Sequence, residues 1–230
     1  MARDSSEPAA ESAQAGGQRD GSTRDAILAA AQRLLARDGY RGVTARQIAA
    51  EAGTNLALVN YYFGSKQNLL LALFDELDRD KLGRQHAMYA ADVPLSAKWR
   101  EAVRFYRQDL EDGFVRMLQE LIALGYGNPA IAERVQRHIN AWRALLEEVA
   151  ASYLPELGID LPPRLVVSAL TSFWQGMETQ HLSGLGEEDG HFFELLDLVG
   201  DWLEARERER AGTSRPTRTP ESAVPGGEVS

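Results

Sequence analysis

Apolar residues recur every three or four positions along most of this 230-residue chain, which is the period of an α-helix. Residues 22–37 place them on one helical face, and residues 66–90 carry a wider, leucine-rich stripe. The same period continues over residues 95–110, 114–124, 129–154, 163–185 and 189–206. No segment shows the sustained two-residue alternation of a half-buried strand. The pattern therefore predicts an all-α fold.

Two short helices joined by a tight turn are predicted between residues 44 and 66. Thr44 is a favourable N-cap for the first, and Gly53 can adopt the left-handed conformation that ends it. Asn55 then caps the second helix. We expect three residues of this second helix to face inward: Leu58, Val59 and Tyr62. Such a pair forms a helix-turn-helix, whose second helix enters the DNA major groove.

The chain divides by composition into four segments. We predict a disordered tail over residues 1–20, a three-helix DNA-binding bundle over 21–66, a helical regulatory and dimerisation domain over 67–206, and a disordered tail over 207–230. Both tails have too few large apolar residues to offset the entropy of ordering. The N-terminal tail is either inert or an arm that contacts DNA through Arg19 and Arg24. It lacks the apolar core of a secretory signal, and no stretch reaches the ~20 apolar residues of a membrane span.

Charge and composition narrow the function. The net charge is −9, yet residues 21–66 hold six basic and three acidic residues, so the local charge there suits a polyanion. The absence of cysteine excludes disulfides and thiolate chemistry and fits a reducing cytoplasm, where we expect the protein to act. We recognise no catalytic constellation, metal-ligand spacing or phosphate-binding glycine loop, so we expect neither an enzyme nor a bound cofactor or metal.

Candidate DNA contacts lie on the exposed side of the predicted helix-turn-helix. Asn60 could pair with an adenine edge, while Leu56 and Ala57 could touch thymine methyl groups. The tyrosine hydroxyls and the helix N-terminus at Thr44 suit phosphate oxygens. The full candidate set is Thr44, Arg46, Asn55, Leu56, Ala57, Asn60, Tyr61, Tyr62 and Lys66.

The last two predicted helices carry more apolar surface than a single packed face needs. In the final helix one stripe is formed by Phe192, Leu196, Val199 and Leu203, and a second by Leu195, Leu198 and Trp202. We expect one face to pack on its own subunit and the other on a second subunit, in a four-helix interface with two-fold symmetry. A helix buried in a monomer core is the alternative. The candidate interface residues are Leu170, Trp174, Phe192, Leu195, Leu196, Val199, Trp202 and Leu203.

Aromatic and polar residues of the second domain could line a ligand cavity. The candidates are Trp99, Tyr106, Met117, His138, Trp142, Phe173, Gln175 and Met177. An apolar or aromatic effector would suit such a lining. Ordinary core packing is the alternative for each residue.

Residues 23–73 resemble the TetR family of bacterial transcriptional regulators. The matching segments are TRDAILAAAQRLLARDGY, VTARQIAAEAG and VNYYFGSKQNLL. Many family members have Val-Ser where this chain has Thr54–Asn55. This difference makes it harder to infer the DNA bases that this chain prefers from those of the family. The resemblance implies a homodimer on a palindromic operator, a phosphate contact from Lys66, a small-molecule effector and repression that the effector relieves. An activator, or a DNA-binding regulator controlled by a protein partner, remains the alternative.

Overall fold

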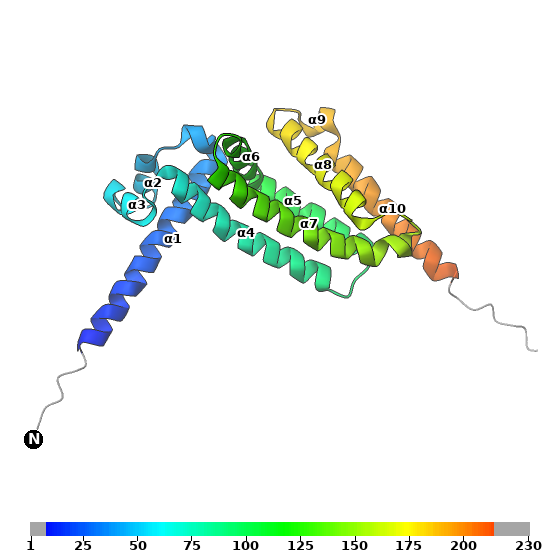
Figure 1. Cartoon of the computed structure of the whole chain (residues 1–230), viewed down its shortest axis with the longest axis horizontal. Helices are drawn as coiled ribbons and strands as arrows, with labels where there is room; N and C mark the ends of the chain where they lie inside the picture. Colours follow the sequence, from blue (N-terminus) through cyan, green and yellow to red (C-terminus); the bar gives the residue numbers. More distant parts are fainter. Residues whose placement is uncertain (1–7, 214–230) are drawn as a thin grey trace, which may run out of the picture.

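The computed structural model describes residues 8–213, with side chains described for residues 21–211. This part of the chain forms ten α-helices and no strand, which confirms the predicted all-α fold. Figure 1 shows α2 and α3 at one end of an elongated molecule and α8 and α10 toward the other. The helices are α1 (Pro8–Gly42), α2 (Ala45–Glu51), α3 (Leu56–Phe63), α4 (Lys66–Ala90), α5 (Leu95–Glu111), α6 (Phe114–Gly125), α7 (Pro129–Leu157), α8 (Pro163–Leu182), α9 (Glu187–Gly190) and α10 (Phe192–Thr213).

The two terminal segments differ from their predicted disorder. The structure includes residues 8–20 in α1 and residues 207–213 in α10, while residues 1–7 and 214–230 lie outside the described part. Arg24, a candidate for an arm on DNA, instead lies within α1 and pairs with Glu76 of α4 at 3.4 Å. Among the helices of residues 8–213, none is long and apolar enough to cross a membrane.

The final predicted helix is divided in two. His191 has a left-handed conformation, with φ of 50°, and separates α9 from α10. The Glu187 carboxylate accepts the backbone N–H of Phe193 at 2.8 Å, so it satisfies a free donor at the start of α10. A local side-chain cap of this kind competes with helix continuation, which explains why the apolar period alone missed the break.

The DNA-binding bundle packs as the apolar pattern predicts, with one correction. Ile27 of α1, Ile48 of α2 and Val59 of α3 are buried together. In α3, however, Phe63 is buried while Leu58 is 36% exposed, so the prediction that Leu58 faces inward was wrong. Val59 and Phe63 are four residues apart and share one face, whereas Leu58 lies at the edge of that face.

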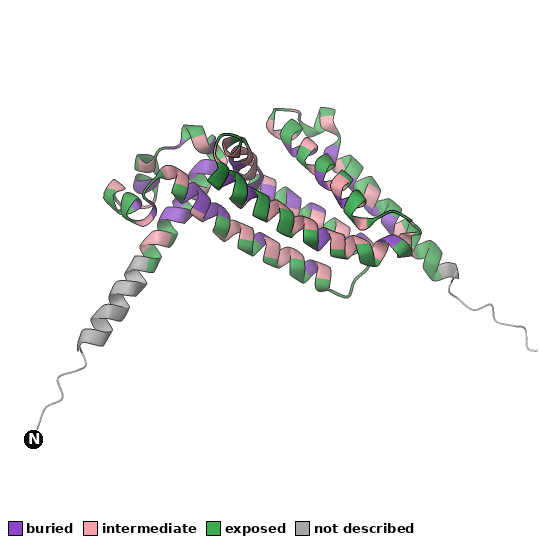
Figure 2. Ribbon diagram, viewed as in Figure 1, coloured by how far each residue is buried: buried purple, intermediate pink, exposed green. Residues whose placement is uncertain are grey.

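The core does not stop at residue 66. Leu69 and Phe74 of α4 belong to the same buried cluster as Met117 and Leu121 of α6 and Ile131 of α7. Figure 2 shows these buried positions where α1, α4, α6 and α7 meet. The DNA-binding bundle and the helical domain therefore share one continuous hydrophobic core, and a rearrangement on one side is felt on the other.

The α1 terminus is held directly by α6. Gly39 breaks α1 with φ of 70° and ψ of 174°, and the next backbone N–H, of Tyr40, donates to both carboxylate oxygens of Glu120 at 3.0 and 2.8 Å. A Cβ on Gly39 would lie 2.8 Å from Glu120 Oε1. One at Gly113, which precedes α6, would lie 2.5 Å from the Cα of Ala36. Two glycines therefore permit the close approach of α6 to α1.

The remaining helices enclose a second core. α5 packs against α10, and α7 packs against both α6 and α8. Figure 1 shows α8 and α10 on the side of α5 and α7 that faces away from α4. Val103, Tyr106, Met177 and Leu196 form the centre of this core.

Replacement of Gly39 by alanine tests the close approach. The Gly39→Ala variant is expected to lose about 1–3 kcal/mol of unfolding free energy, because a side chain there meets both a left-handed backbone and the Glu120 carboxylate. The control is Gly83→Ala, on an exposed turn of α4 with open space around it, which is expected to be neutral or stabilising by up to ~1 kcal/mol. Urea unfolding measures both. Equal stability of the two variants would contradict the account.

Candidate DNA interface and regulatory cavity

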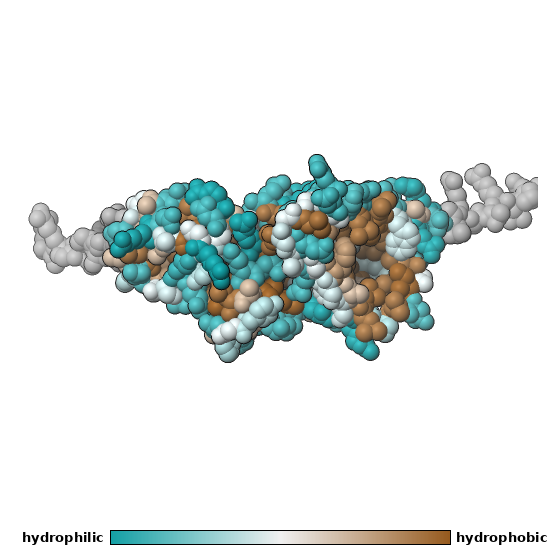
Figure 3. Space-filling model, turned by 90° about the horizontal axis from the view of Figure 1, so that it is seen from above, coloured by the Kyte–Doolittle hydropathy of each residue, from teal (hydrophilic) through white to brown (hydrophobic). Residues whose placement is uncertain are grey.

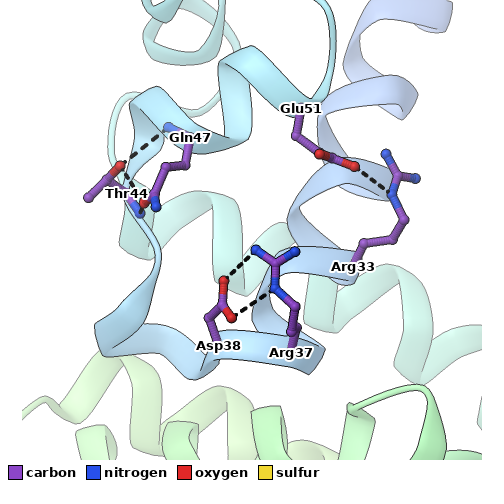
Figure 4. A network of polar contacts seen from close by, with 6 residues as sticks. All are labelled: Arg33, Arg37, Asp38, Thr44, Gln47 and Glu51. Carbon is purple, nitrogen blue, oxygen red and sulfur yellow. Dashed lines mark hydrogen bonds and ion pairs between the residues drawn. The ribbon is translucent and has the colours of Figure 1, made fainter.

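Side-chain caps fix the two short helices of the helix-turn-helix. Thr44 caps α2: its Oγ1 accepts the Gln47 N–H at 3.3 Å, and the Gln47 side chain accepts the Thr44 N–H at 2.8 Å. This reciprocal capping box, which sequence inspection missed at Gln47, is drawn in Figure 4. The predicted cap at Asn55 is confirmed, because its Oδ1 accepts the Leu58 N–H at 3.0 Å. Gly53 has φ of 65°, as the turn requires.

The candidate DNA contacts of α3 lie on its exposed side. Ala57 and Asn60 are exposed, Tyr61 is 75% exposed, and Leu56 and Tyr62 are half-buried. The Tyr61 and Tyr62 rings pack edge to face at 5.2 Å, which restricts both side chains. The structure thus gathers these residues on one accessible surface of a short, capped helix, with the Thr44 and Arg46 side chains also exposed at the start of α2.

Ion pairs reduce the positive charge that this region can offer. Arg33 pairs with Glu51 at 3.0 Å and Arg37 with Asp38 at 2.7 Å, as Figure 4 shows. These pairs tie α1 to α2 and hold the end of α1. Within the described residues, Arg41 and Arg46 are the arginines of this region that form no ion pair.

Lys66 has a structural partner that the sequence did not reveal. Its Nζ donates to the carbonyl oxygens of Tyr40 at 2.6 Å and Val43 at 2.8 Å, and lies 3.9 Å from the centre of the Tyr40 ring. Burial lowers the pKa of the ammonium, while Glu120 acts in the opposite direction. Lys66 therefore clamps the α1–α2 connection to the start of α4. A contact with DNA phosphate stays a proposal.

A cavity of about 110 Å³ lies inside the helical domain. Four of the predicted ligand-site residues line it: Trp99, Tyr106, His138 and Trp142. The other predictions differ. Met117 and Met177 are buried in the two cores, Phe173 borders an adjoining groove, and Gln175 is exposed. Gln175 lies two residues before Met177, on the opposite side of α8.

Charged residues in the cavity wall were missed by sequence reasoning. Lys81 of α4 and Asp109 of α5 are buried and paired at 2.6 Å. Lys81 also contacts Asp112 at 2.6 Å, and Arg84 pairs with Asp109. Two cations and two carboxylates therefore neutralise one another beside the cavity. The available signal was a lysine and a carboxylate placed on the apolar side of their helices.

Glu178 of α8 is the remaining carboxylate in the wall and is only 7% exposed. Its Oε2 accepts a hydrogen bond from Gln119 Nε2 of α6 at 2.6 Å. Among the described residues no ammonium or guanidinium forms an ion pair with it. Burial raises the pKa of Glu178 to about 7, with a smaller contribution from the Asp109 charge and an opposing one from Gln119. Burial, followed by the Glu178 charge, raises the pKa of the Tyr106 hydroxyl.

Aromatic rings surround the inner end of the cavity. Trp174 packs edge to face against Trp99 at 6.2 Å and against Tyr106 at 5.1 Å. The Tyr106 hydroxyl is buried without a hydrogen-bond partner in the described residues. His138, expected as a polar handle, instead bonds through Nδ1 to Asp78. The cavity thus offers aromatic faces, the Glu178 carboxyl group, the Tyr106 hydroxyl and the Gln85 side-chain oxygen, and the last two have no hydrogen-bond partner among the described residues.

An apolar groove of about 420 Å³ adjoins the cavity between α7, α8 and α10. The two spaces share the lining residues Tyr89, Trp99, Leu146 and Leu170. Figure 3 shows apolar side chains gathered around a hollow in this half of the molecule. The small cavity, which contains charged and aromatic side chains, and the larger apolar groove therefore lie side by side, and we refer to them together as the composite space.

The predicted dimer residues separate into three groups. Phe192, Leu196 and Leu203 are buried within their own subunit, so placing them in the dimer interface was wrong. Trp174 and Leu170 line the cavity, and Val199 lines the groove. The second stripe remains uncovered: Leu195, Leu198 and Trp202 are 44%, 59% and 45% exposed. On α8, Leu165 and Phe173 are likewise exposed.

No group of three or more His, Asp or Glu side chains is arranged to hold a metal ion among the described residues. The described cavity residues carry two buried carboxylates, and one of these is already paired with cations.

The geometry defines an all-α protein with an N-terminal helix-turn-helix and a helical domain that encloses a cavity. Residues 27–73 match the family described as "Bacterial regulatory proteins, tetR family". The N-terminal part of the chain is therefore similar to the N-terminal domain of TetR-family transcriptional regulators.

Curated relatives match between a quarter and three fifths of the chain. The HTH-type transcriptional regulator BetI of Agrobacterium fabrum is 47% identical over 57 residues, which cover 25% of this chain and 28% of BetI. The HTH-type transcriptional regulator CymR of Pseudomonas putida is 28% identical over 141 residues, 60% of this chain and 68% of CymR. For the probable regulator YttP of Bacillus subtilis the match is 23% over 133 residues, 58% of each chain. The matched part thus spans about a quarter to two thirds of these relatives.

Solved structures support the fold over most of the chain. A transcriptional regulator from Saccharomonospora viridis in complex with choline has a TM-score of 0.66 at 22% identity, covering 79% of this chain and 93% of that one. The regulator FadR from Bacillus subtilis in complex with stearoyl-CoA has a TM-score of 0.62 at 18% identity, covering 77% and 96%. These identities are low, so the likeness concerns the fold alone.

Glu178 predicts a pH-dependent stability. With a folded pKa of about 7 against 4.5 for the ordinary carboxyl, the folded protein retains a proton between these pH values that the unfolded chain releases. This contribution to stability is fully present below pH 4.5 and is lost as pH rises through 7. Glu178→Gln, which imitates the protonated group, is therefore expected to match wild type near pH 5 and to be more stable at pH 8 by roughly 2 kcal/mol, or about 4–8 °C in Tm.

Thermal unfolding of both proteins at pH 5 and pH 8 provides the measurement. Glu148→Gln is the matched control, because Glu148 is exposed on α7 and forms no ion pair in the described structure. Its difference from wild type is expected to be the same at both pH values. A Glu178→Gln variant that gains nothing between pH 5 and pH 8 would refute the ionisation argument.

Proposed function

We propose that this protein is a cytoplasmic, ligand-responsive transcriptional regulator that binds a palindromic operator as a homodimer. Repression relieved by a small-molecule inducer is the mode we favour. The observation that carries the proposal is the position of α6, which touches the DNA-binding bundle on one side and the cavity on the other. The ligands in two similar folds, choline and stearoyl-CoA, support a role for the cavity in effector binding.

DNA binding is supported by the accessible face of α3. Exposed Ala57, Asn60 and Tyr61 project from a helix whose start is fixed by the Asn55 cap and whose inner face is buried. A rigid helix can present base-reading groups without a large loss of side-chain and backbone entropy on binding. Asn60 can accept from and donate to an adenine edge, and exposed Arg46 can contact phosphate.

A physical connection links the cavity to this helix. On α6, Gln119 donates to Glu178 in the cavity wall, and its neighbour Glu120 accepts the Tyr40 N–H at the end of α1. A ligand that moves Glu178 alters the position of α6, and α6 holds the α1 terminus at a site where there is no spare space. Tyr40 and Lys66 then pass the change to the start of α4 and the helix-turn-helix.

Dimerisation is supported by the uncovered apolar surface of the last two long helices. Leu198 and Trp202 lie on the exposed stripe of α10, and Leu165 is exposed on α8 outside the groove. A contiguous apolar surface of this kind marks a protein interface. Two-fold pairing of α8 and α10 would give two reading helices, as a palindrome requires.

DNase footprinting on the DNA that flanks the coding region tests DNA binding. Wild type is expected to protect a palindromic site whose half-sites are about 34–36 Å, or one helical turn, apart or a multiple of this. Asn60→Ala is expected to weaken binding to the best site by about 5- to 100-fold and to reduce discrimination among site variants. Asn140→Ala, an exposed residue of α7, is the control and is expected to behave as wild type. Failure to protect any palindrome would refute the proposal.

Light scattering after gel filtration tests the dimer. Trp202→Glu places a charge on the exposed stripe of α10 and is expected to convert a dimer of wild type into monomer, with loss of operator affinity. Leu161→Glu is the matched control, because Leu161 is 55% exposed before α8 and lies off that stripe. A dimeric Trp202→Glu protein would place the interface elsewhere.

A further inference from the structure

We propose that the effector is an organic cation with an apolar chain, whose charged end lies against Glu178 among the aromatic rings of the cavity and whose chain occupies the adjoining groove. This inference rests on the proposed function for its regulatory meaning, although the binding itself is independent of DNA. It follows from the charge, the lining and the volumes of the composite space.

The charge of the cavity wall favours a positively charged ligand. Lys81 and Arg84 are neutralised by Asp109 and Asp112 through ion pairs at the cavity wall. Glu178 adds one carboxylate for which the described residues provide a hydrogen bond from Gln119 but no cation. The wall therefore carries a net negative charge when Glu178 is ionised. An anionic ligand would meet this charge without a free cation to balance it, whereas a cation would supply the missing partner.

The aromatic rings favour the same class. Trp174 packs edge to face against both Trp99 and Tyr106, and these three residues line the cavity together with Trp142 and Glu178. The faces of Trp and Tyr rings attract cations, most strongly where water is excluded. Tyr106 also presents a buried hydroxyl with no described partner. A carboxylate beside several aromatic rings is suited to an ammonium group.

The volumes of the cavity and the groove indicate the shape of the ligand. The cavity holds about 110 Å³, which is less than the ~300–1,000 Å³ of a site for a drug-sized molecule. The groove adds about 420 Å³ and is lined almost entirely by apolar side chains from α7, α8 and α10. Trp99, Leu146 and Leu170 line both spaces, so the two adjoin. A small charged head with an aliphatic tail fills both parts, whereas a compact polar solute fills only the first.

The ionisation of Glu178 adds a pH dependence to binding. The titratable and charged residues that line the cavity with it are Lys81 and Tyr89 from α4, Tyr106 and Asp109 from α5, and His138 from α7, and Gln119 from α6 is its hydrogen-bond donor. Since the pKa of Glu178 is about 7 in the empty protein, about a tenth of the carboxyl groups are ionised at pH 6 and about nine tenths at pH 8. The affinity for a permanent cation should therefore rise about tenfold between these values.

Isothermal titration of the full-length protein with three eight-carbon probes tests the inference: octyltrimethylammonium, octanol and octanoate. The cation is expected to bind wild type at pH 8 at least tenfold more tightly than the neutral or the anionic probe. Tryptophan fluorescence provides a second readout, because Trp99, Trp142 and Trp174 line the cavity while Trp202 lies outside it. Tighter binding of octanoate or octanol would overturn the proposal.

Variants at two glutamates locate the binding. Glu178→Gln is nearly isosteric and keeps an acceptor for Gln119, so it is expected to fold, to lose at least tenfold in affinity for octyltrimethylammonium and to lose the pH dependence. Its affinity for octanol is expected to be unchanged. Glu148→Gln, the exposed control, is expected to bind all three probes as wild type does. Unchanged cation affinity in Glu178→Gln would overturn the assignment of the site.

Operator binding, measured on the same preparations with no probe present, separates this inference from the proposed function. Protected DNA together with no preference for the cation would refute the effector class alone. Binding of the cation through Glu178, together with no protected operator, would support the effector class and refute the regulatory proposal.

Discussion

The structure depends on how the end of α1 is held at Tyr40. The Glu120 carboxylate of α6 accepts its N–H, and the Lys66 ammonium of α4 donates to its carbonyl oxygen. Both charged groups are partly removed from water. Their hydrogen bonds to the Tyr40 backbone therefore replace part of the hydration that each group loses. Gly39 makes this arrangement possible, because a side chain there would strike Glu120.

This junction also connects the DNA-binding bundle to the helical domain that contains the cavity. The hydrophobic core runs without interruption from Ile27 in α1 to Leu121 in α6 and Ile131 in α7, so the two halves cannot move independently. A tightly packed core has discrete arrangements and resists continuous deformation. The polar contacts of Gln119 and Glu120 lie on the two sides of α6 and give that helix a partner in each half.

Local signals predicted much of the fold. Thr44 and Asn55 cap the helices that the sequence assigns to them, because a cap depends on residues only three positions apart. The apolar period likewise predicted the buried faces of α1 and α2. It misassigned Leu58 and Phe192, since the direction of a side chain relative to a neighbouring helix depends on the crossing of the two helices. The apolar period of a single helix does not encode the angle at which it crosses its neighbour.

The sites were harder to predict for the same reason. Four cavity residues were identified from their chemistry, but Glu178, Lys81 and Asp109 were missed because their meaning depends on partners 28 or more positions away in the sequence. Lys66 matched a family motif, yet its contacts with Tyr40 and Val43 were visible only in three dimensions. The exposed stripe of α10 was predicted correctly because it required only the period of that helix.

The central claim is that the contact of Glu120 with Tyr40 sets the position of the DNA-binding bundle. The distance between the two DNA-binding bundles of the proposed dimer provides the most direct test of this claim. The chain has no cysteine, so a spin label at Ala50→Cys, an exposed site on α2, is unique in each subunit. Pulsed electron paramagnetic resonance on the operator-bound dimer should give one narrow distance distribution. Adding Glu120→Ala should broaden or shift the distribution in the free dimer and weaken operator binding by tenfold or more. An unchanged distribution with unchanged operator affinity would contradict the account.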